Sequence, residues 1–486
     1  MAKILKSRRA GVLLHATSLP GPQTCGSLGA DALRWIDWLA ASGFRLWQVL
    51  PLTPVSDGSP YNSYSAFAGY MQLIDIAALQ DLGFPPIGDG LPDPATPAYV
   101  SKALQRQFDW FQQQQEGALR DQFRQFTQSQ HWLENYCLFS ALKEVHPQHW
   151  EEWPAPLRDR EPSAIKAFAS EHQSRIDFHR FAQFIFMLQW QRLKQHANSK
   201  GIALFGDMPI FVAHDSVDVW SHRDLFKLDA AGHTTVIAGV PPDYFSAQGQ
   251  RWGNPLYAWD RHAADDYQWW RERIGHSLTL YDAVRIDHFR GFMACWEIPA
   301  SESTAINGTW VPAPGDALFA SLQKAHPDLP LIAEDLGLIT PDVIELRRKY
   351  KLPGMKILQF AFDSDGANPY LPHNHSLNSV VYSGTHDNNT TLGWFQALND
   401  DIKRRILEYY AQPNEPMPWP IIKSTLASPG RWAILPLQDL LALGTEHRMN
   451  VPGTTADNWR WRFDWQQVDA NLAPHLNNLN RLYYRI

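Results

Sequence analysis

Acidic residues and histidines follow short apolar runs at several points of the chain. Arg285 and Asp287 end one such run, Glu334 follows a second, and His386 and Asp387 follow a third. In a β-strand, residues i and i+2 face the same side, so Arg285 lies beside Asp287 and favours its charged form. A carboxyl group that follows a buried run is partly desolvated. Desolvation raises the pKa of Glu334 and lets it donate a proton.

A charged carboxylate and a carboxylic acid with separate roles are what cleavage of a glycosidic bond with retention requires. The residues therefore point to Asp287 as nucleophile and Glu334 as acid/base. Asp387 is a candidate for holding sugar hydroxyls as the transition state forms. If water receives the sugar the reaction is hydrolysis, and if another sugar receives it the reaction is transfer.

The elements that must position these residues are strands and helices in alternation. Eight short apolar runs predict strands at 11–15, 46–51, 203–207, 283–287, 331–334, 356–360, 380–383 and 433–437. Amphipathic stretches predict helices at 30–42, 178–197, 269–279, 316–325, 342–349 and 401–410. Such alternation predicts a parallel sheet covered on both faces, and eight units predict an α/β fold of the (β/α)8 TIM barrel type. A doubly wound sheet is the alternative, but no glycine-rich phosphate turn follows the first strand.

The spacing of the strands predicts one catalytic barrel, 1–486, with two insertions. Residues 77–177 read as a mainly helical insertion between strands two and three. Residues 208–281 read as an insertion between strands three and four, rich in Gly, Pro and aromatic residues, which carries a loop over the cleft. Because barrel enzymes have their sites at the carboxyl ends of the strands, we expect Asp207, Asp287, Glu334, Asp363 and Asp387 to gather on one rim with His15 and His386.

Composition narrows the class of protein. The 486 residues include 44% hydrophobic and 19% charged residues, which is typical of a globular fold, and 21 tryptophans, which suit both a core and the stacking of sugar rings. The net charge of −7 and the absence of a basic stripe predict no nucleic-acid partner. No apolar run is long enough for a membrane span. Three distant cysteines predict no disulfide framework, and they favour a cytoplasmic location.

Several motifs together resemble those of one enzyme family. Val284–His288 is similar to the nucleophile motif of the α-amylase clan, and Glu334 and His386–Asp387 are similar to its acid/base and stabiliser motifs. More specific are SPYNSYSAFAG (59–69), GDMPI (206–210), PPDYFSAQGQRWGNP (241–255), DHFRG (287–291), IAEDLG (332–337) and RMNVPGT (448–454). In this order they resemble the amylomaltases, the 4-alpha-glucanotransferases of glycoside hydrolase family 77, from about residue 8 to Trp465.

The resemblance implies retaining transfer of α-1,4-glucan segments, with Asp287 as nucleophile, Glu334 as acid/base and Asp387 as stabiliser. Arg285 and His386 would support catalysis. The implied substrate-binding residues are Tyr61, which would stack on a sugar ring, Asp207, His288 and Asp363, and, on the loop over the cleft, Tyr244, Phe245, Trp252 and Asn254. The partners would be α-1,4-glucans and malto-oligosaccharides as donor and acceptor. The resemblance implies no cofactor, no metal, no separate carboxyl-terminal β-domain and no particular oligomeric state.

Two departures from the family pattern bear on the glucans that are preferred. Asn62 and Tyr64 stand where many bacterial relatives have Gln and Phe, and residues 55–58 have no aromatic, where some relatives place one in a second glucan site. The resemblance therefore implies neither a second site nor a preferred glucan length.

Three alternatives remain at the level of the sequence. A metal-dependent barrel hydrolase would use the Asp, Glu and His side chains as ligands. The first strand lacks the His-x-His pair that is usual in such enzymes. Inactivation by EDTA would favour this alternative. A carbohydrate-binding protein without catalytic activity would not need paired carboxylates, which this sequence has. A glucan hydrolase on the same fold differs only through the motifs of the cleft-covering loop.

Overall fold

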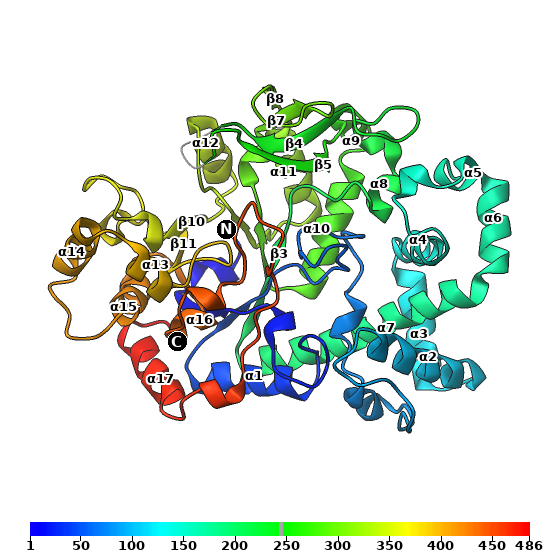
Figure 1. Cartoon of the computed structure of the whole chain (residues 1–486), viewed down its shortest axis with the longest axis horizontal. Helices are drawn as coiled ribbons and strands as arrows, with labels where there is room; N and C mark the ends of the chain where they lie inside the picture. The colour runs from blue at the N-terminus through cyan, green and yellow to red at the C-terminus, as the bar shows by residue number, and fades with distance from the viewer. Residues whose placement is uncertain (243–245) are drawn as a thin grey trace.

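The computed structural model describes residues 1–242 and 246–486, and its centre is an eight-stranded parallel sheet (Figure 1). The strands are β1 (Arg9–Leu13), β2 (Leu46–Gln48), β3 (Ala203–Met208), β6 (Ala283–Ile286), β9 (Leu331–Ala333), β10 (Gly354–Ile357), β11 (Ser379–Tyr382) and β12 (Trp432–Pro436). Their order is β10-β11-β12-β1-β2-β3-β6-β9. The amide of Ala333 donates to the carbonyl oxygen of Pro353 (2.9 Å), which brings the two outer strands together. The predicted (β/α)8 barrel is confirmed, and so are its eight strands.

Successive side chains along each barrel strand point alternately into the barrel and outward toward the helices. Phe205 packs with the apolar residues of the barrel interior, whereas its neighbour Leu204 packs in the larger core outside the sheet. The strands approach one another closely where side chains are small. A Cβ on Gly11 of β1 would lie 2.4 Å from the Cβ of Leu46 on β2, so only glycine fits there.

Helices surround the barrel, and the predicted ones are all present. They are α1 (Ala30–Ala41), α7 (Gln173–Ser199), α10 (Gln268–Leu280), α11 (Gly315–Ala325), α12 (Pro341–Lys349) and α14 (Asp400–Tyr409). Further helices are α8 (Val217–Ser221), α9 (Trp259–Ala264), α13 (Thr391–Ala397), α15 (Trp419–Ala427), α16 (Leu437–Leu440) and α17 (Leu472–Leu482). Within the described part of the chain, no helix is long and apolar enough to cross a membrane.

The segment between β2 and β3 is mostly helical and extends from one side of the barrel (Figure 1). Its helices are α2 (Ala98–Gln113), α3 (Ala118–Ser129), α4 (Leu133–Val145), α5 (Ala155–Arg158) and α6 (Pro162–Glu171), and α7 leads back to β3. Buried residues of α4 and α7 belong to the same apolar cluster as the residues outside the sheet. This segment therefore shares a core with the barrel.

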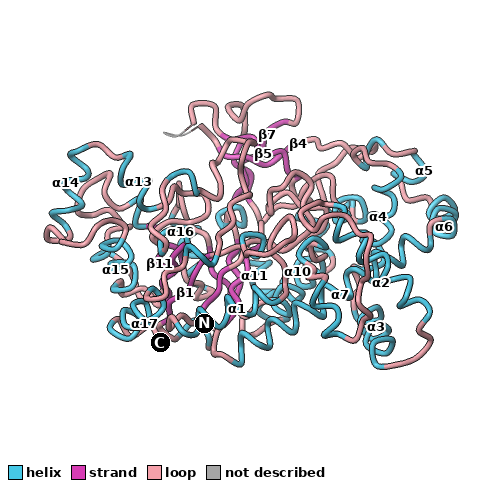
Figure 2. Tube along the Cα trace, turned by 60° about the horizontal axis from the view of Figure 1, so that its bottom comes forward, coloured by secondary structure: helices cyan, strands magenta, loops and turns pink. Residues whose placement is uncertain are grey.

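A second sheet was not predicted from the sequence. It is four-stranded and antiparallel, with the order β5-β4-β7-β8, and consists of β4 (Val236–Val240), β5 (Gln250–Pro255), β7 (Ala294–Pro299) and β8 (Thr309–Pro312). Two of its strands precede β6 in the chain and two follow it. In Figure 2 it stands apart from the barrel strands, at the top of the view. It fixes the segment around Trp252 that the sequence predicted to be a shaped loop.

Candidate active site

The charged residues of the site continue the inward-facing positions of three adjacent strands. Each lies two residues beyond an apolar residue of the barrel interior, so its side chain points the same way. These pairs are Phe205 and Asp207 on β3, Ala283 and Arg285 on β6, and Ile332 and Glu334 at the end of β9. Asp287 comes two residues after Arg285, as predicted.

Arg285 joins two of the predicted carboxylates. Its Nη1 donates to both oxygens of Asp207 (2.8 and 2.7 Å), and its Nη2 donates to Oδ1 of Asp287 (2.7 Å). Burial alone would lower the pKa of Arg285, but the two carboxylates together raise it well above its usual range. The guanidinium therefore stays charged, and it orients an Asp287 side chain that remains one-third exposed, at 33%.

Tyr61 and His386 extend this network across the barrel. The Tyr61 hydroxyl donates to Oδ2 of Asp207 (2.9 Å) and lies 2.9 Å from Nε2 of His386, which in turn is 3.3 Å from Oδ2 of Asp387. Because Tyr61 gives its single proton to Asp207, the hydrogen between Tyr61 and His386 belongs to Nε2. Burial and the Asp207 carboxylate raise the pKa of Tyr61, so the phenol keeps its proton. The rings of Tyr61 and His386 also stack, with centroids 5.3 Å apart.

Glu334 occupies a different environment from Asp287. Its Oε2 accepts a hydrogen bond from the amide of His288 (2.7 Å), and its Oε1 accepts one from the amide of Leu336 (2.9 Å). Burial, and next the charge of Asp287, raise the pKa of Glu334 to about 7. A carboxyl group with such a pKa carries a proton for much of the time near neutral pH, as a general acid must.

Asp387 is held by two residues for which no role was predicted. Nδ2 of Asn450 donates to Oδ1 of Asp387 (2.6 Å), and Nη2 of Arg448 donates to its carbonyl oxygen (3.0 Å). Both residues lie in the 448–454 motif, which was the signal available in the sequence. Trp459, also unpredicted, has its ring centroid 5.8 Å from that of Tyr61.

His288 and Trp252 face each other beside Glu334. Their ring centroids are 4.8 Å apart at an angle of 86°, and Trp252 is 38% exposed, the only exposed tryptophan in the described chain. Burial lowers the pKa of His288 to about 4 and keeps the imidazole neutral. Its Nε2 is buried with no hydrogen-bond partner among the described residues, which leaves it free for a ligand hydroxyl.

Two further predicted residues, Asn254 and Asp363, lie outside this network. The side-chain Nδ2 of Asn254 donates to the carbonyl oxygen of Val212 (2.9 Å), which ties β5 to the loop after β3. Asp363 is exposed, and its Oδ1 accepts a hydrogen bond from Asn368 within its own loop (3.0 Å). Tyr244 and Phe245 lie outside the described residues.

A family model described as 4-alpha-glucanotransferase, that of glycoside hydrolase family 77, matches residues 14–467. The chain belongs to the 4-alpha-glucanotransferase family. It is 46% identical to a 4-alpha-glucanotransferase of Synechocystis sp., over 99% of each chain, and 47% identical to one of Thermus thermophilus, over 96% of each chain. Its activity is accordingly that of a 4-alpha-glucanotransferase, an enzyme also called amylomaltase.

A solved structure supports the same conclusion. The amylomaltase from Streptococcus agalactiae in complex with acarbose has a TM-score of 0.93 and 38% identity, and the match covers 98% of this chain and 99% of that one. This chain and that amylomaltase are therefore similar in both fold and sequence over nearly their whole length.

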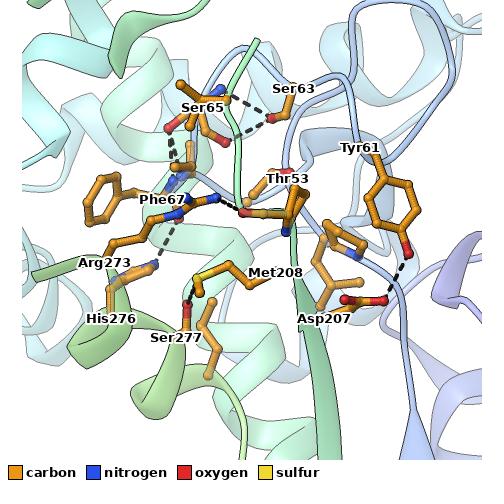
Figure 3. Close-up of a pocket in the computed structure, with 18 of the residues that line it drawn as sticks. Thr53, Tyr61, Ser63, Ser65, Phe67, Asp207, Met208, Arg273, His276 and Ser277 are labelled. Carbon is orange, nitrogen blue, oxygen red and sulfur yellow. Dashed lines mark hydrogen bonds between the residues drawn. The ribbon is translucent and has the colours of Figure 1, made fainter. Parts of the chain in front are cut away.

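Two cavities adjoin the Tyr61–His386 pair of this glucanotransferase. One is lined by Tyr61 and Asp207 and reaches back to α10 (Figure 3). There Arg273 donates to the carbonyl oxygens of Pro209 (2.6 Å) and Ile210 (3.1 Å), which fastens the turn after Asp207 to α10. A second cavity is lined by His15 and His386.

Proposed function

We propose that the chain transfers α-1,4-glucan segments by a retaining double displacement in which Asp287, Glu334 and Asp387 act directly on the substrate. In the first step an oxygen of Asp287 bonds to the anomeric carbon, and the bond from that carbon to the O4 of the leaving glucan breaks. The proton of Glu334 passes to that O4. The product of this step is a glycosyl-enzyme ester.

In the second step the roles reverse. The Glu334 carboxylate takes the proton from the 4-hydroxyl of an acceptor glucan or glucose, whose oxygen bonds to the anomeric carbon as the ester bond to Asp287 breaks. Two inversions at one carbon give retention, and Glu334 regains its proton for the next cycle. Asp387, oriented by Asn450, holds hydroxyls of the reacting sugar during both steps.

The observation that carries this assignment is the difference between the two carboxyl environments. Arg285 donates to Asp287, which favours a carboxylate able to attack carbon, whereas burial raises the pKa of Glu334 to about 7. A carboxylate held by an arginine, beside a second carboxyl group whose pKa is raised by burial, is the pattern of a nucleophile and its acid/base partner.

Contacts to the glucan follow from the groups beside these carboxylates. We assign the hydroxyl contacts of the central sugar to Asp207, His288 and His386, and ring stacking to Tyr61 and Trp252. Tyr244, Phe245, Asn254 and Asp363 are proposed contacts further along the glucan. The donors and acceptors are α-1,4-glucans and malto-oligosaccharides, and Trp252 excludes water from the ester, which favours transfer over hydrolysis.

We also infer the organisation and location of the enzyme. Residues 1–486 form one catalytic barrel, in which 77–177 and 208–281 are insertions that shape the cleft. All three cysteines are free, which is typical of a reducing compartment and supports a cytoplasmic location.

Incubation with maltotriose tests the mechanism. A ladder of longer maltodextrins together with glucose is expected, and Asp287→Asn is expected to remove nearly all of it while the circular dichroism spectrum stays unchanged. Formation of glucose and maltose alone would mean hydrolysis. Full turnover by the Asp287→Asn variant would show that another residue is the nucleophile.

A further inference from the structure

Away from the catalytic rim, two histidines and a glutamate converge where the helical segment meets the barrel. His149 and Glu151 lie on the turn between α4 and α5, and His214 lies on the loop after β3. One ligand atom from each lies within 4.8 Å of the others. Among the described residues this is the one such group of three.

The tautomer of His214 is fixed by its surroundings. Its Nε2 lies 2.8 Å from the carbonyl oxygen of Gly232, which can only accept, so Nε2 carries the hydrogen. The lone pair of the neutral ring is therefore on Nδ1. A backbone carbonyl on the far nitrogen is the usual arrangement behind a metal-ligating histidine.

With the ring neutral, no proton lies between that lone pair and the oxygen that it faces. Nδ1 of His214 is 3.1 Å from Oε2 of Glu151, which is buried and accepts no hydrogen bond. Two acceptors at this distance repel each other unless a positive charge is shared. In a tetrahedral zinc site with bonds of about 2.1 Å, neighbouring ligand atoms are about 3.4 Å apart, close to the separation here.

The two segments that carry these ligands are clamped together. The backbone amide of Trp150 donates to Oδ1 of Asp215 (3.2 Å), and its indole Nε1 donates to the carbonyl oxygen of His214 (2.7 Å). Nζ of Lys143 pairs with Oδ2 of the same Asp215 (2.7 Å). The positions on either side of Trp150 are thus held against His214 before any ligand binds, so binding orders few groups.

We propose that His149, Glu151 and His214 form a binding site for a divalent transition-metal ion, with Zn²⁺ as the best fit. Two imidazoles and a carboxylate suit Zn²⁺, whereas Mg²⁺ and Ca²⁺ prefer sites made of oxygens. His149 is exposed, so it can turn onto the ion, and the fourth position is open to water. The ion links the helical segment to the loop after β3, and it takes no part in glucan transfer.

Zinc titration of the untagged enzyme tests this site. Protein treated with EDTA and then desalted is titrated with ZnCl₂ by calorimetry, with MgCl₂ as the comparison ion. One equivalent of Zn²⁺ is expected to bind and to raise the thermal midpoint, because an ion that binds the folded state stabilises it. Cobalt in place of zinc is expected to give the visible absorption bands of a tetrahedral site.

Variants separate this site from the other histidines of the chain. His149→Ala and Glu151→Gln are expected to weaken zinc binding more than about tenfold, since the loss of even an outer partner has that effect. His131→Ala is the matched control, because His131 is exposed, pairs with a single carboxylate, that of Glu272 (3.2 Å), and belongs to no such group of three among the described residues. Turnover of maltotriose by His149→Ala is expected to be unchanged.

The proposal is wrong if the stripped enzyme takes up no stoichiometric zinc, or if His149→Ala and Glu151→Gln bind zinc as the unmodified chain does. Either result would mean that His214 and Glu151 form a proton-mediated ion pair.

Discussion

In the mechanism that we propose, Glu334 sets how the reaction depends on pH. The first step needs its protonated form, and its pKa is raised to about 7, mainly by burial. Below that pH the acid is present, and above it the acid is lost, so we expect kcat/KM to fall as the pH rises through about 7. Initial rates on maltotriose between pH 5 and 9 measure this.

The variant Glu334→Gln tests whether Glu334 causes this fall of kcat/KM at high pH. Loss of a general acid costs about 10²–10⁴-fold in rate. The small remaining activity is expected to be flat across the same pH range. If kcat/KM of the variant still falls as the pH rises, another group causes the fall.

Asn450 is expected to act by positioning Asp387. Its amide is buried and bonds to Asp387 Oδ1 at 2.6 Å, so Asn450→Ala frees that carboxylate to rotate. We expect kcat to fall by up to about a hundredfold, the effect of a small misplacement, with little change in KM. Thr454→Ala in the same loop is the control, because Thr454 bonds only to that loop in the described structure. A rise in KM alone would make Asn450 a binding residue instead.

Part of the site follows from strand periodicity and part does not. Asp207, Arg285, Asp287 and Glu334 are predictable because two-residue alternation carries the inward face past the apolar core. The bond from Tyr61 to Asp207 and the contact with His386 join three segments far apart in the chain, and no spacing in the sequence relates them. The role predicted for Tyr61 was stacking, so its hydroxyl contacts emerged only from the fold.

At the scale of elements, β5 carries Trp252, the residue that we propose covers the reacting centre. Trp252→Ala is expected to raise the share of hydrolysis, because water then reaches the ester. The increase in reducing ends, compared with the amount of transfer product, measures that share. Arg251→Ala is the control on the same strand, since Arg251 donates to the carbonyl oxygens of Glu302 and Ala300. An equal effect of both variants would point to a disturbed sheet.

The close approach of β1 and β2 makes a prediction for stability. Gly11→Ala places a Cβ 2.4 Å from that of Leu46 and 2.6 Å from its carbonyl oxygen. Overpacking of this kind costs about 1–3 kcal/mol in the free energy of unfolding, which urea denaturation measures. Gly366→Ala, where nothing lies within 4 Å, is the matched control and is expected to be neutral. Equal stability of the two variants would mean that the strands shift apart freely.

The sequence predicted the barrel more completely than the second sheet. Barrel strands are buried apolar runs between amphipathic helices, a pattern that is readable locally. The strands β4, β5, β7 and β8 are short and contain Gly, Pro or exposed polar residues, and β6 of the barrel lies between the two pairs. Their pairing is a long-range property, so the segment was predicted as a loop.

At the scale of the whole molecule, the reactivity of the three cysteines can show which parts unfold together. Cys25 precedes α1, Cys137 lies in α4 and Cys295 lies in β7, so each thiol marks a different part. Burial raises the pKa of Cys25 to about 11 and that of Cys295 to about 12, so slow reaction of the native thiols is expected.

Cys137 and Cys295 belong to one apolar cluster, so we expect them to become reactive in the same transition. Thiol labelling along a urea series, read by mass spectrometry of peptides, checks this. Labelling of Cys137 at lower urea would mean that the helical segment opens separately.

The pairing of β1 with β12 bears on how the chain is made. Arg9 lies opposite Trp432, so the first strand of the barrel to leave the ribosome meets one of its two neighbours only after nearly all of the described chain has been synthesised. Until then one edge of β1 stays open, and an open strand edge invites pairing with other chains. We therefore expect ribosome-bound chains of this enzyme to need chaperones throughout translation. We also expect a chain that is truncated before β12 to aggregate.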